Sequence, residues 1–196
     1  MTLYHMSDSL QLGDTLNGDF QHLNQLIEPF FRALMRSEDC FYAMLMNVIY
    51  TTNVFYRNNI HDRVDHPKYA TEAIFEYVRC TQFPDCNSRI WSNYFYDDLE
   101  QCRRFYDFTW GKASEEFQRC VHMYEIEVDQ ATLDKRDMRI YDIAYKNMCE
   151  ETDIAVIKAC ARRYFAGEAT DDPVWEYLSE AEAIAVRDVT EYLRKN

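Results

Sequence analysis

His5 is the first candidate for a functional side chain, because it follows residues that favour a strand. Leu3 and Tyr4 suit a half-buried pleated surface, and Gly13-Asp14 supplies a turn signal. A histidine at the end of a first strand can sit in a cleft with ring nitrogens that donate or accept hydrogen bonds. The alternative is a strand-end histidine that packs or faces solvent, and this stretch by itself leaves both open.

Two other histidines have a spacing that could bind a metal. His61 and His66 flank Asp62 and Asp65 in a polar segment that ends at Pro67. The spacing is weak and the segment reads as a loop, so we do not expect a metal centre there. The seven cysteines are odd in number and form no CxxC or CxxH pair, so a zinc site is not expected either.

The composition predicts one globular domain over residues 1–196. The chain is 47% hydrophobic and 15% aromatic, which gives it large side chains to bury. It has only four Gly and four Pro, which argues against a loop-rich sandwich and against disordered linkers. The scattered cysteines, with no signal peptide and no long apolar run, predict reduced thiols in a cytoplasmic protein without a membrane partner.

The formal net charge is -13. A strongly acidic surface repels phosphate backbones, so non-specific binding to nucleic acid through a basic stripe is not expected. Two other classes of function stay open, namely binding to a basic protein partner and mimicry of the charge of a nucleic acid.

Apolar residues at helical spacing predict most of the helices. From residue 23 to 56 the stripe is interrupted at Ser37-Glu38-Asp39, which indicates two helices or one bent helix. Further helices are expected over 68–81, over 98–108 with Asp97 as the N-cap, and over 152–165, where Gly167 ends the helix.

Strand-like segments lie at the start, middle and end of the chain, over 3–7, 89–96, 121–128, 174–178 and 183–189. The apolar residues of 121–128 cannot all share one face, so a bulge or burial on both faces is needed. The prediction is an α+β fold with a helical insertion at about 20–82, after the first strand.

Short motifs follow one another along these predicted elements: Tyr4-His5-Met6-Ser7, Leu12-Gly13-Asp14, Tyr94-Phe95-Tyr96-Asp97-Asp98-Leu99, Met123-Tyr124-Glu125-Ile126-Glu127-Val128, Arg136-Asp137-Met138, Arg163-Tyr164-Phe165-Ala166-Gly167 and Trp175-Glu176-Tyr177-Leu178. In this order they resemble the ADP-ribosyltransferase fold, with its split β-sheet core. More narrowly, they resemble the branch that includes the rifampin ADP-ribosyltransferases and a group of uncharacterised bacterial and phage proteins. The resemblance covers most of the chain outside the insertion.

The resemblance implies a site for NAD as substrate. In such a site His5, on the first strand, bonds the adenosine ribose, and Ser7 is a further cofactor-binding candidate. Tyr94 stacks on the nicotinamide, and Arg89 pairs with the diphosphate through charge-assisted bonds. Each has a structural alternative: Tyr94 and its aromatic neighbours as core residues, and Arg89 as the partner of a surface acid.

The resemblance also implies a carboxylate beside the ribose, because cleavage of the bond to nicotinamide develops positive charge there. Glu176 is the candidate, and Asp137 is a second carboxylate candidate. The alternatives are a solvent-facing strand residue for Glu176 and a helix cap for Asp137. Many transferases of this fold carry an acid or amide two positions before the catalytic Glu, where this chain has Val174.

Val174 weakens a prediction of arginine-directed protein modification. It leaves transfer to an unidentified acceptor (a protein, a nucleic acid or a small molecule), hydrolysis of NAD, or a catalytically dead copy. The first hypothesis is therefore an NAD-dependent ADP-ribosyltransferase in a toxin or phage conflict setting. The second is a non-catalytic acidic protein, of the inhibitor or nucleic-acid-mimic type, whose partner is a basic protein or an antitoxin. Cysteine-based catalysis is the weakest of the three hypotheses.

Overall fold

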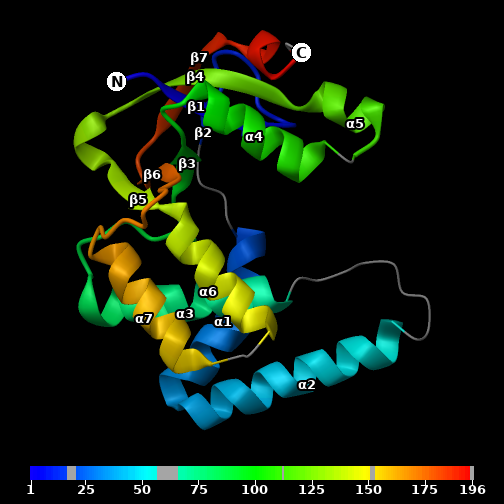
Figure 1. The fold of residues 1–196 in the computed structure, drawn as a ribbon, viewed down its shortest axis with the longest axis vertical. Helices are drawn as coiled ribbons and strands as arrows, with labels where there is room; N and C mark the ends of the chain where they lie inside the picture. Colours follow the sequence, from blue (N-terminus) through cyan, green and yellow to red (C-terminus); the bar gives the residue numbers. More distant parts are fainter. Residues whose placement is uncertain (17–20, 57–65, 112, 151–152, 195–196) are drawn as a thin grey trace. The chain divides into compact units, whose positions relative to one another are not determined.

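The computed structural model of the chain describes residues 1–16, 21–56, 66–111, 113–150 and 153–194. Their contacts form two compact units that the chain enters alternately (Figure 1). Residues 1–18, 91–136 and 174–196 make up the strand unit, and residues 19–90 and 137–173 make up the helical unit. The mixed α+β class predicted from the sequence is confirmed, while the prediction of a single domain over 1–196 stays a prediction.

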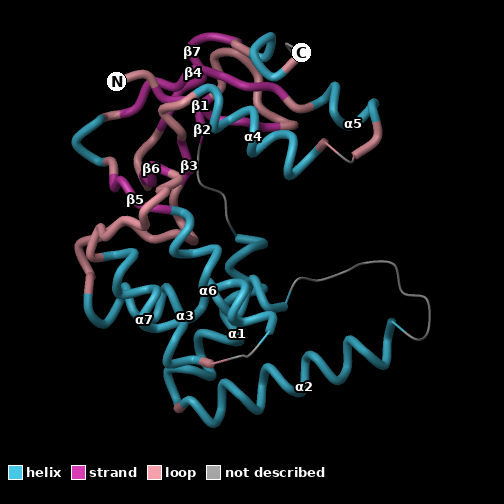
Figure 2. The backbone as a smooth tube through the Cα atoms, viewed as in Figure 1, coloured by secondary structure: helices cyan, strands magenta, loops and turns pink. Residues whose placement is uncertain are grey.

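The strand unit contains two sheets (Figure 2). The four-stranded sheet has the order β1-β4-β7-β2 and the three-stranded sheet the order β3-β6-β5. The backbones of Tyr4 and Tyr96 join them, because each donates its N–H to the carbonyl of the other at 2.8 and 3.0 Å. The strands are β1 (Leu3–Ser7), β2 (Thr15–Leu16), β3 (Asn93–Phe95), β4 (His122–Val128), β5 (Asp134–Asp137), β6 (Trp175–Ser179) and β7 (Ala183–Asp188).

Strand β4 has a feature that its sequence predicts. The adjacent residues Met123 and Tyr124 are both buried, so the strand buries side chains on both faces, one of the two predicted alternatives. Its antiparallel register with β7 also shifts between Glu125 and Ile126, and the extra residue there, Val186, belongs to β7. The first half of the strand therefore pairs Tyr124 with Asp188, and the second half pairs Ile126 with Ala185. Strand β3 is shorter than the predicted strand over 89–96, and the short strand β5 was not predicted as a strand.

Helix α4 (Leu99–Trp110) begins one residue later than predicted. Asp98 is its N-cap, since Asp98 Oδ1 accepts from the backbone N–H groups of Glu100 and Gln101. Asp97 instead accepts from the hydroxyl of Tyr177 at 2.6 Å, so the prediction of Asp97 as the cap is wrong. The sequence prediction also missed helix α5 (Glu115–Cys120), whose six residues are too few to show a helical stripe.

The sheets bury two clusters of apolar side chains in the strand unit. The cluster around β1, β3 and β6 contains Leu3, Leu16, Phe95, Tyr124, Ile126, Tyr177, Ala183 and Ala185. The cluster against α4 contains Met6, Tyr96, Cys102, Tyr106, Val121, Met123, Val189 and Leu193. Because successive strand residues point to opposite faces, Leu3 and Met6 of one short strand serve different clusters.

The helical unit consists of α1 (Gln21–Arg36), α2 (Glu38–Tyr56), α3 (His66–Gln82), α6 (Met138–Glu150) and α7 (Ile154–Phe165) (Figure 1). Ser37 separates α1 from α2, and its hydroxyl accepts from the backbone N–H of Cys40 at 3.1 Å, so the segment is two helices. Gly167 follows α7 with a φ of 75°, a backbone conformation that favours glycine, which confirms the predicted stop.

The inserted helices share their core with helices from later in the chain. Helix α3 packs against α6 and α7, and α1 packs against α3. Fully buried Phe75 and Ile74 come from α3, while Ile140 and Tyr164 come from α6 and α7. The insertion therefore forms part of one helical core, and it follows the short strand β2 instead of β1.

Within the ranges that the structure describes, no helix is both long enough and apolar enough to cross a membrane.

Candidate functional site

His5 is tied to strand β3 through one ring nitrogen. Its Nδ1 lies 2.8 Å from the carbonyl oxygen of Tyr94. A carbonyl only accepts, so Nδ1 carries the proton and, in the neutral ring, Nε2 is left as an acceptor. The half-buried ring meets Phe95 edge-on at a centroid distance of 6.1 Å. Burial lowers the pKa of His5, and the bond to Tyr94 opposes this only in part, so the neutral form is favoured.

Tyr94 and Glu176 lie on one face of the β3–β6 pair. Tyr94 is the cross-strand partner of Leu178, and Glu176 is two residues from Leu178 on the same strand. Alternation along a strand puts Glu176 on the face of Leu178 and Tyr94, as diagonal neighbours. Phe95 and Tyr177 share the opposite face, so the His5 ring packs on the side of β3 away from the Tyr94 side chain.

Glu176 is buried, with 1% of its surface exposed. This excludes the alternative of a solvent-facing strand residue. Charged side chains are costly to bury, so a buried carboxylate on a short strand is held there by its surroundings. The strand unit thus brings three of the candidate residues, His5, Tyr94 and Glu176, onto strands that are hydrogen-bonded to one another.

Ser7 has a local structural role. Its hydroxyl accepts from the backbone N–H groups of Ser9 and Leu10 at 3.2 and 3.1 Å, which turns the chain at the end of β1. In the register of β1 with β4, Ser7 stands opposite His122, and His5 stands opposite Tyr124.

Arg89 belongs to the helical unit and is occupied by partners there. Its Nε and Nη2 donate to the two carboxylate oxygens of Glu72 at 3.1 and 3.3 Å, and Nη1 donates to the hydroxyl of Tyr164 at 2.7 Å. Its guanidinium also lies 4.0 Å from the centroid of the Tyr141 ring. Arg89 pairs with an acid, as in the structural alternative, but this acid is buried instead of lying at the surface. Arg89 is therefore not part of the candidate site.

Asp137 holds a turn of the helical unit. Its Oδ1 accepts from the backbone N–H of Arg139 at 3.0 Å, near the start of α6. Its Oδ2 accepts from the backbone N–H and the hydroxyl of Thr170 at 2.8 and 2.7 Å. These bonds support the helix-cap alternative for Asp137, which is fully buried.

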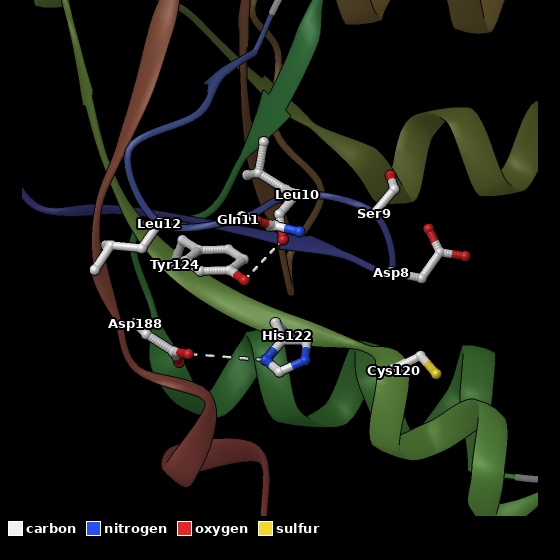
Figure 3. Close-up of a pocket in the computed structure, with 9 residues that line it drawn as sticks. All are labelled: Asp8, Ser9, Leu10, Gln11, Leu12, Cys120, His122, Tyr124 and Asp188. Carbon is white, nitrogen blue, oxygen red and sulfur yellow. Dashed lines mark hydrogen bonds and ion pairs between the residues drawn. The ribbon is translucent and has the colours of Figure 1, made fainter.

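The strand unit has a surface pocket that the sequence did not reveal (Figure 3). It lies on the sheet face that carries His5, because its residues Tyr124 and His122 are the cross-strand partners of His5 and Ser7. Asp188 of β7 lines it too, and its Oδ2 is 3.7 Å from His122 Nδ1. The alternation of apolar and polar residues along 121–128 predicts the strand. The neighbouring sequence does not indicate which residues of other strands pair with it.

Cys120 also lines this pocket, two residues before His122. Figure 3 shows its sulfur directed away from the imidazole, and the thiol donates to the carbonyl of Glu116 at 3.4 Å. Cys120 is the last residue of α5. This geometry does not support cysteine-based catalysis.

The possible metal ligands fall partly outside the described residues. His61, Asp62 and Asp65 are not described, and His66 is the first residue of α3. Among the residues with described positions, no group of three or more His, Cys, Asp or Glu side chains could hold a metal ion.

Comparison with known proteins places the chain in a family. A family model described as a protein of unknown function, DUF2441, matches residues 3–191. The chain belongs to the DUF2441 family. The match runs from β1 into the last short helix of the strand unit, so the family includes both units. No curated protein matches this DUF2441 chain.

Proposed function

We propose that the strand unit binds NAD and transfers its ADP-ribose to an acceptor. The observation that carries this proposal is the bond from His5 Nδ1 to the carbonyl of Tyr94, which leaves Nε2 as an acceptor for a ribose hydroxyl. Two antiparallel sheets that meet where Tyr4 pairs with Tyr96 also fit a split β-sheet core.

Strand β1 offers a further polar edge beside His5. The N–H and C=O of Tyr4 point to Tyr96, so those of Met6, two residues on, point to the same side of β1. The bridge between Tyr4 and Tyr96 is antiparallel and isolated, so Met6 lies towards Tyr94, beyond the one backbone pair described between β1 and β3. An amide such as the carboxamide of nicotinamide has the donor and acceptor that such a backbone edge requires.

Glu176 supplies the electrostatic part of the mechanism. When the bond between ribose C1′ and the nicotinamide nitrogen breaks, the electron pair leaves with nicotinamide and positive charge develops on the ribose. A fixed carboxylate in a water-poor site stabilises that charge more strongly than one in bulk water. The acceptor then attacks C1′ and loses a proton. Tyr94, on the face of Glu176, offers a ring against which the nicotinamide can stack.

Isothermal titration of NAD into the purified chain tests the proposal. We expect micromolar to millimolar binding that is lost in His5→Ala and kept in His122→Ala, a matched change on the paired strand. NAD should also raise the melting temperature of the wild type and of His122→Ala. No detectable heat with a folded protein, or equal binding by both variants, would refute it.

The net charge of -13 favours a second candidate function, an acidic protein that binds a basic partner. It predicts no response to NAD and an association with a basic protein that weakens steeply as salt is raised. The NAD titration separates the two candidates directly.

A further inference from the structure

The pocket beside β4 has a wall held by hydrogen bonds, and the inference drawn from it does not rest on the NAD proposal. Its volume is about 410 Å³, within the roughly 300–1,000 Å³ of small-molecule sites. The loop that follows β1 forms the wall. The Tyr124 hydroxyl donates to the Leu10 carbonyl at 2.8 Å, and Gly13 N–H donates to the Ala185 carbonyl at 2.8 Å. The φ of Gly13 is 87°, which favours glycine at this turn.

One side of the pocket is an aromatic surface. The rings of His122 and Tyr124 stack with a centroid distance of 6.1 Å and an angle of 27° between their planes. Leu10 and Leu12 line the pocket from the loop, so a ligand stem meets apolar as well as aromatic atoms (Figure 3). Such a surface favours flat or alkyl groups and attracts a cation to the ring faces.

The pocket also carries negative charge. Of the nine lining residues, Asp8 and Asp188 are acidic and none is Lys or Arg. Partial burial tends to raise the pKa of Asp188, but the hydroxyl and N–H of Thr190 and the neighbouring His122 lower it more, and the net pKa is below its ordinary value. Asp188 is therefore a carboxylate at neutral pH. Figure 3 shows it beside the His122 ring.

We propose that this pocket binds a small organic cation, a primary amine on a short aromatic or apolar stem. The ammonium group pairs with Asp188, and the stem lies against the His122–Tyr124 stack and the leucines of the loop. Asp188 Oδ1 is already held by the backbone N–H of Thr190 at 2.8 Å, which fixes the carboxylate without neutralising it. The site is thus ordered before a ligand arrives, which lowers the entropic cost of binding.

Benzylamine and benzyl alcohol are the matched probes, because they have the same ring and stem but only benzylamine carries a charge at neutral pH. In calorimetric titrations at low salt we expect saturable binding of benzylamine and none of benzyl alcohol. Asp188→Asn should weaken the binding of benzylamine about tenfold, as expected for loss of a charged hydrogen-bond partner. NMR shifts of the His122 ring should report the site directly.

Glu182→Gln is the control, because Glu182 is exposed between β6 and β7, does not line the pocket, and the change removes the same charge. It should leave the affinity for benzylamine unchanged. Equal losses in Glu182→Gln and Asp188→Asn would mean a general charge effect and would overturn the proposal. So would saturable binding of benzyl alcohol as strong as that of benzylamine, or no binding of benzylamine to a folded wild type.

The amine could be a free metabolite or a lysine side chain, and the titration distinguishes them. If N-acetyl-lysine methylamide binds more tightly than benzylamine through Asp188, a lysine side chain is the ligand. If it binds more weakly, the ligand is a free amine. If neither probe loses affinity in Asp188→Asn, no cation is recognised here and the proposal fails.

Discussion

Arg89 and Asp137 of the helical unit differ from His5 of the strand unit in how many of their hydrogen-bonding atoms have partners. In the helical unit, Arg89 donates from all three of its nitrogens, to Glu72 and to Tyr164. Asp137 accepts on both of its oxygens. In the strand unit, His5 commits Nδ1 to a backbone carbonyl, and no described residue bonds its Nε2. Polar groups that already make all their hydrogen bonds stabilise the fold. Polar groups that still have a donor or acceptor to offer can bind a ligand.

The comparison teaches where a candidate site can be built. Four of the sequence candidates, His5, Ser7, Tyr94 and Glu176, lie in the strand unit, while Arg89 and Asp137 lie in the helical unit. The difference predicts that changes to the second group reduce stability and changes to the first group reduce binding or turnover.

The largest expected effect is on stability, from Arg89→Met. It leaves the carboxylate of Glu72 buried without its partner, which costs about 3–5 kcal/mol of the free energy of unfolding. Urea denaturation measures it. The double variant Arg89→Met with Glu72→Leu should recover part of the loss, since it removes both charges. If Arg89→Met folds with normal stability but no longer binds NAD, the result would support the prediction that Arg89 binds the diphosphate.

Glu176→Gln should reduce turnover instead. Loss of the carboxylate should slow release of nicotinamide from NAD about 10²–10³-fold, as for removal of one electrostatic stabiliser of a transition state. Binding of NAD should persist. Chromatography of released nicotinamide measures the rate, and Glu182→Gln again serves as the matched control on the exposed turn. If Glu176→Gln releases nicotinamide as fast as wild type, Glu176 has no such role.

Asp137→Ala should cost about 1–3 kcal/mol of the free energy of unfolding, because it leaves the partly buried N–H groups of Arg139 and Thr170 without their acceptor. Asp137→Asn keeps one acceptor oxygen and should cost less. Thermal denaturation compares the two. If Asp137→Asn stays as stable as wild type but loses turnover of NAD, Asp137 is a second catalytic carboxylate and the division between the units fails.

The smallest expected effect is a pH dependence that comes from His5. Burial lowers its pKa in the folded chain below the ordinary 6.5, so the unfolded chain binds more protons between the two values. The free energy of unfolding therefore falls as pH drops below about 6.5. Denaturant titrations across this range should show a shallower decline for His5→Gln than for wild type. An equal decline in His5→Gln would mean that His5 is not buried in its neutral form.

Much of the secondary structure could be predicted because its causes are local. Apolar spacing at three and four residues predicted α1, α2, α3 and α7, and Ser37 and Gly167 marked their ends. The N-cap of α4 was misplaced by one residue, because Asp97 and Asp98 are chemically equivalent caps. Only the hydroxyl of Tyr177, from a strand 80 residues away in sequence, engages Asp97 and leaves the cap to Asp98.

By itself the sequence determined the α+β class, the strand over 121–128 with a bulge or burial on both faces, and a first strand that carries His5, since these follow from residue types and periodicity. The prediction that His5 ends that strand is wrong, because His5 is the middle residue of β1. The tertiary structure decided which polar groups have hydrogen-bond partners. It bound His5 to Tyr94, placed Arg89 on Glu72, buried Glu176, and set His122 and Asp188 around one pocket. Strand register and helix packing join residues far apart in the chain, and one sequence carries no local signal for such pairs.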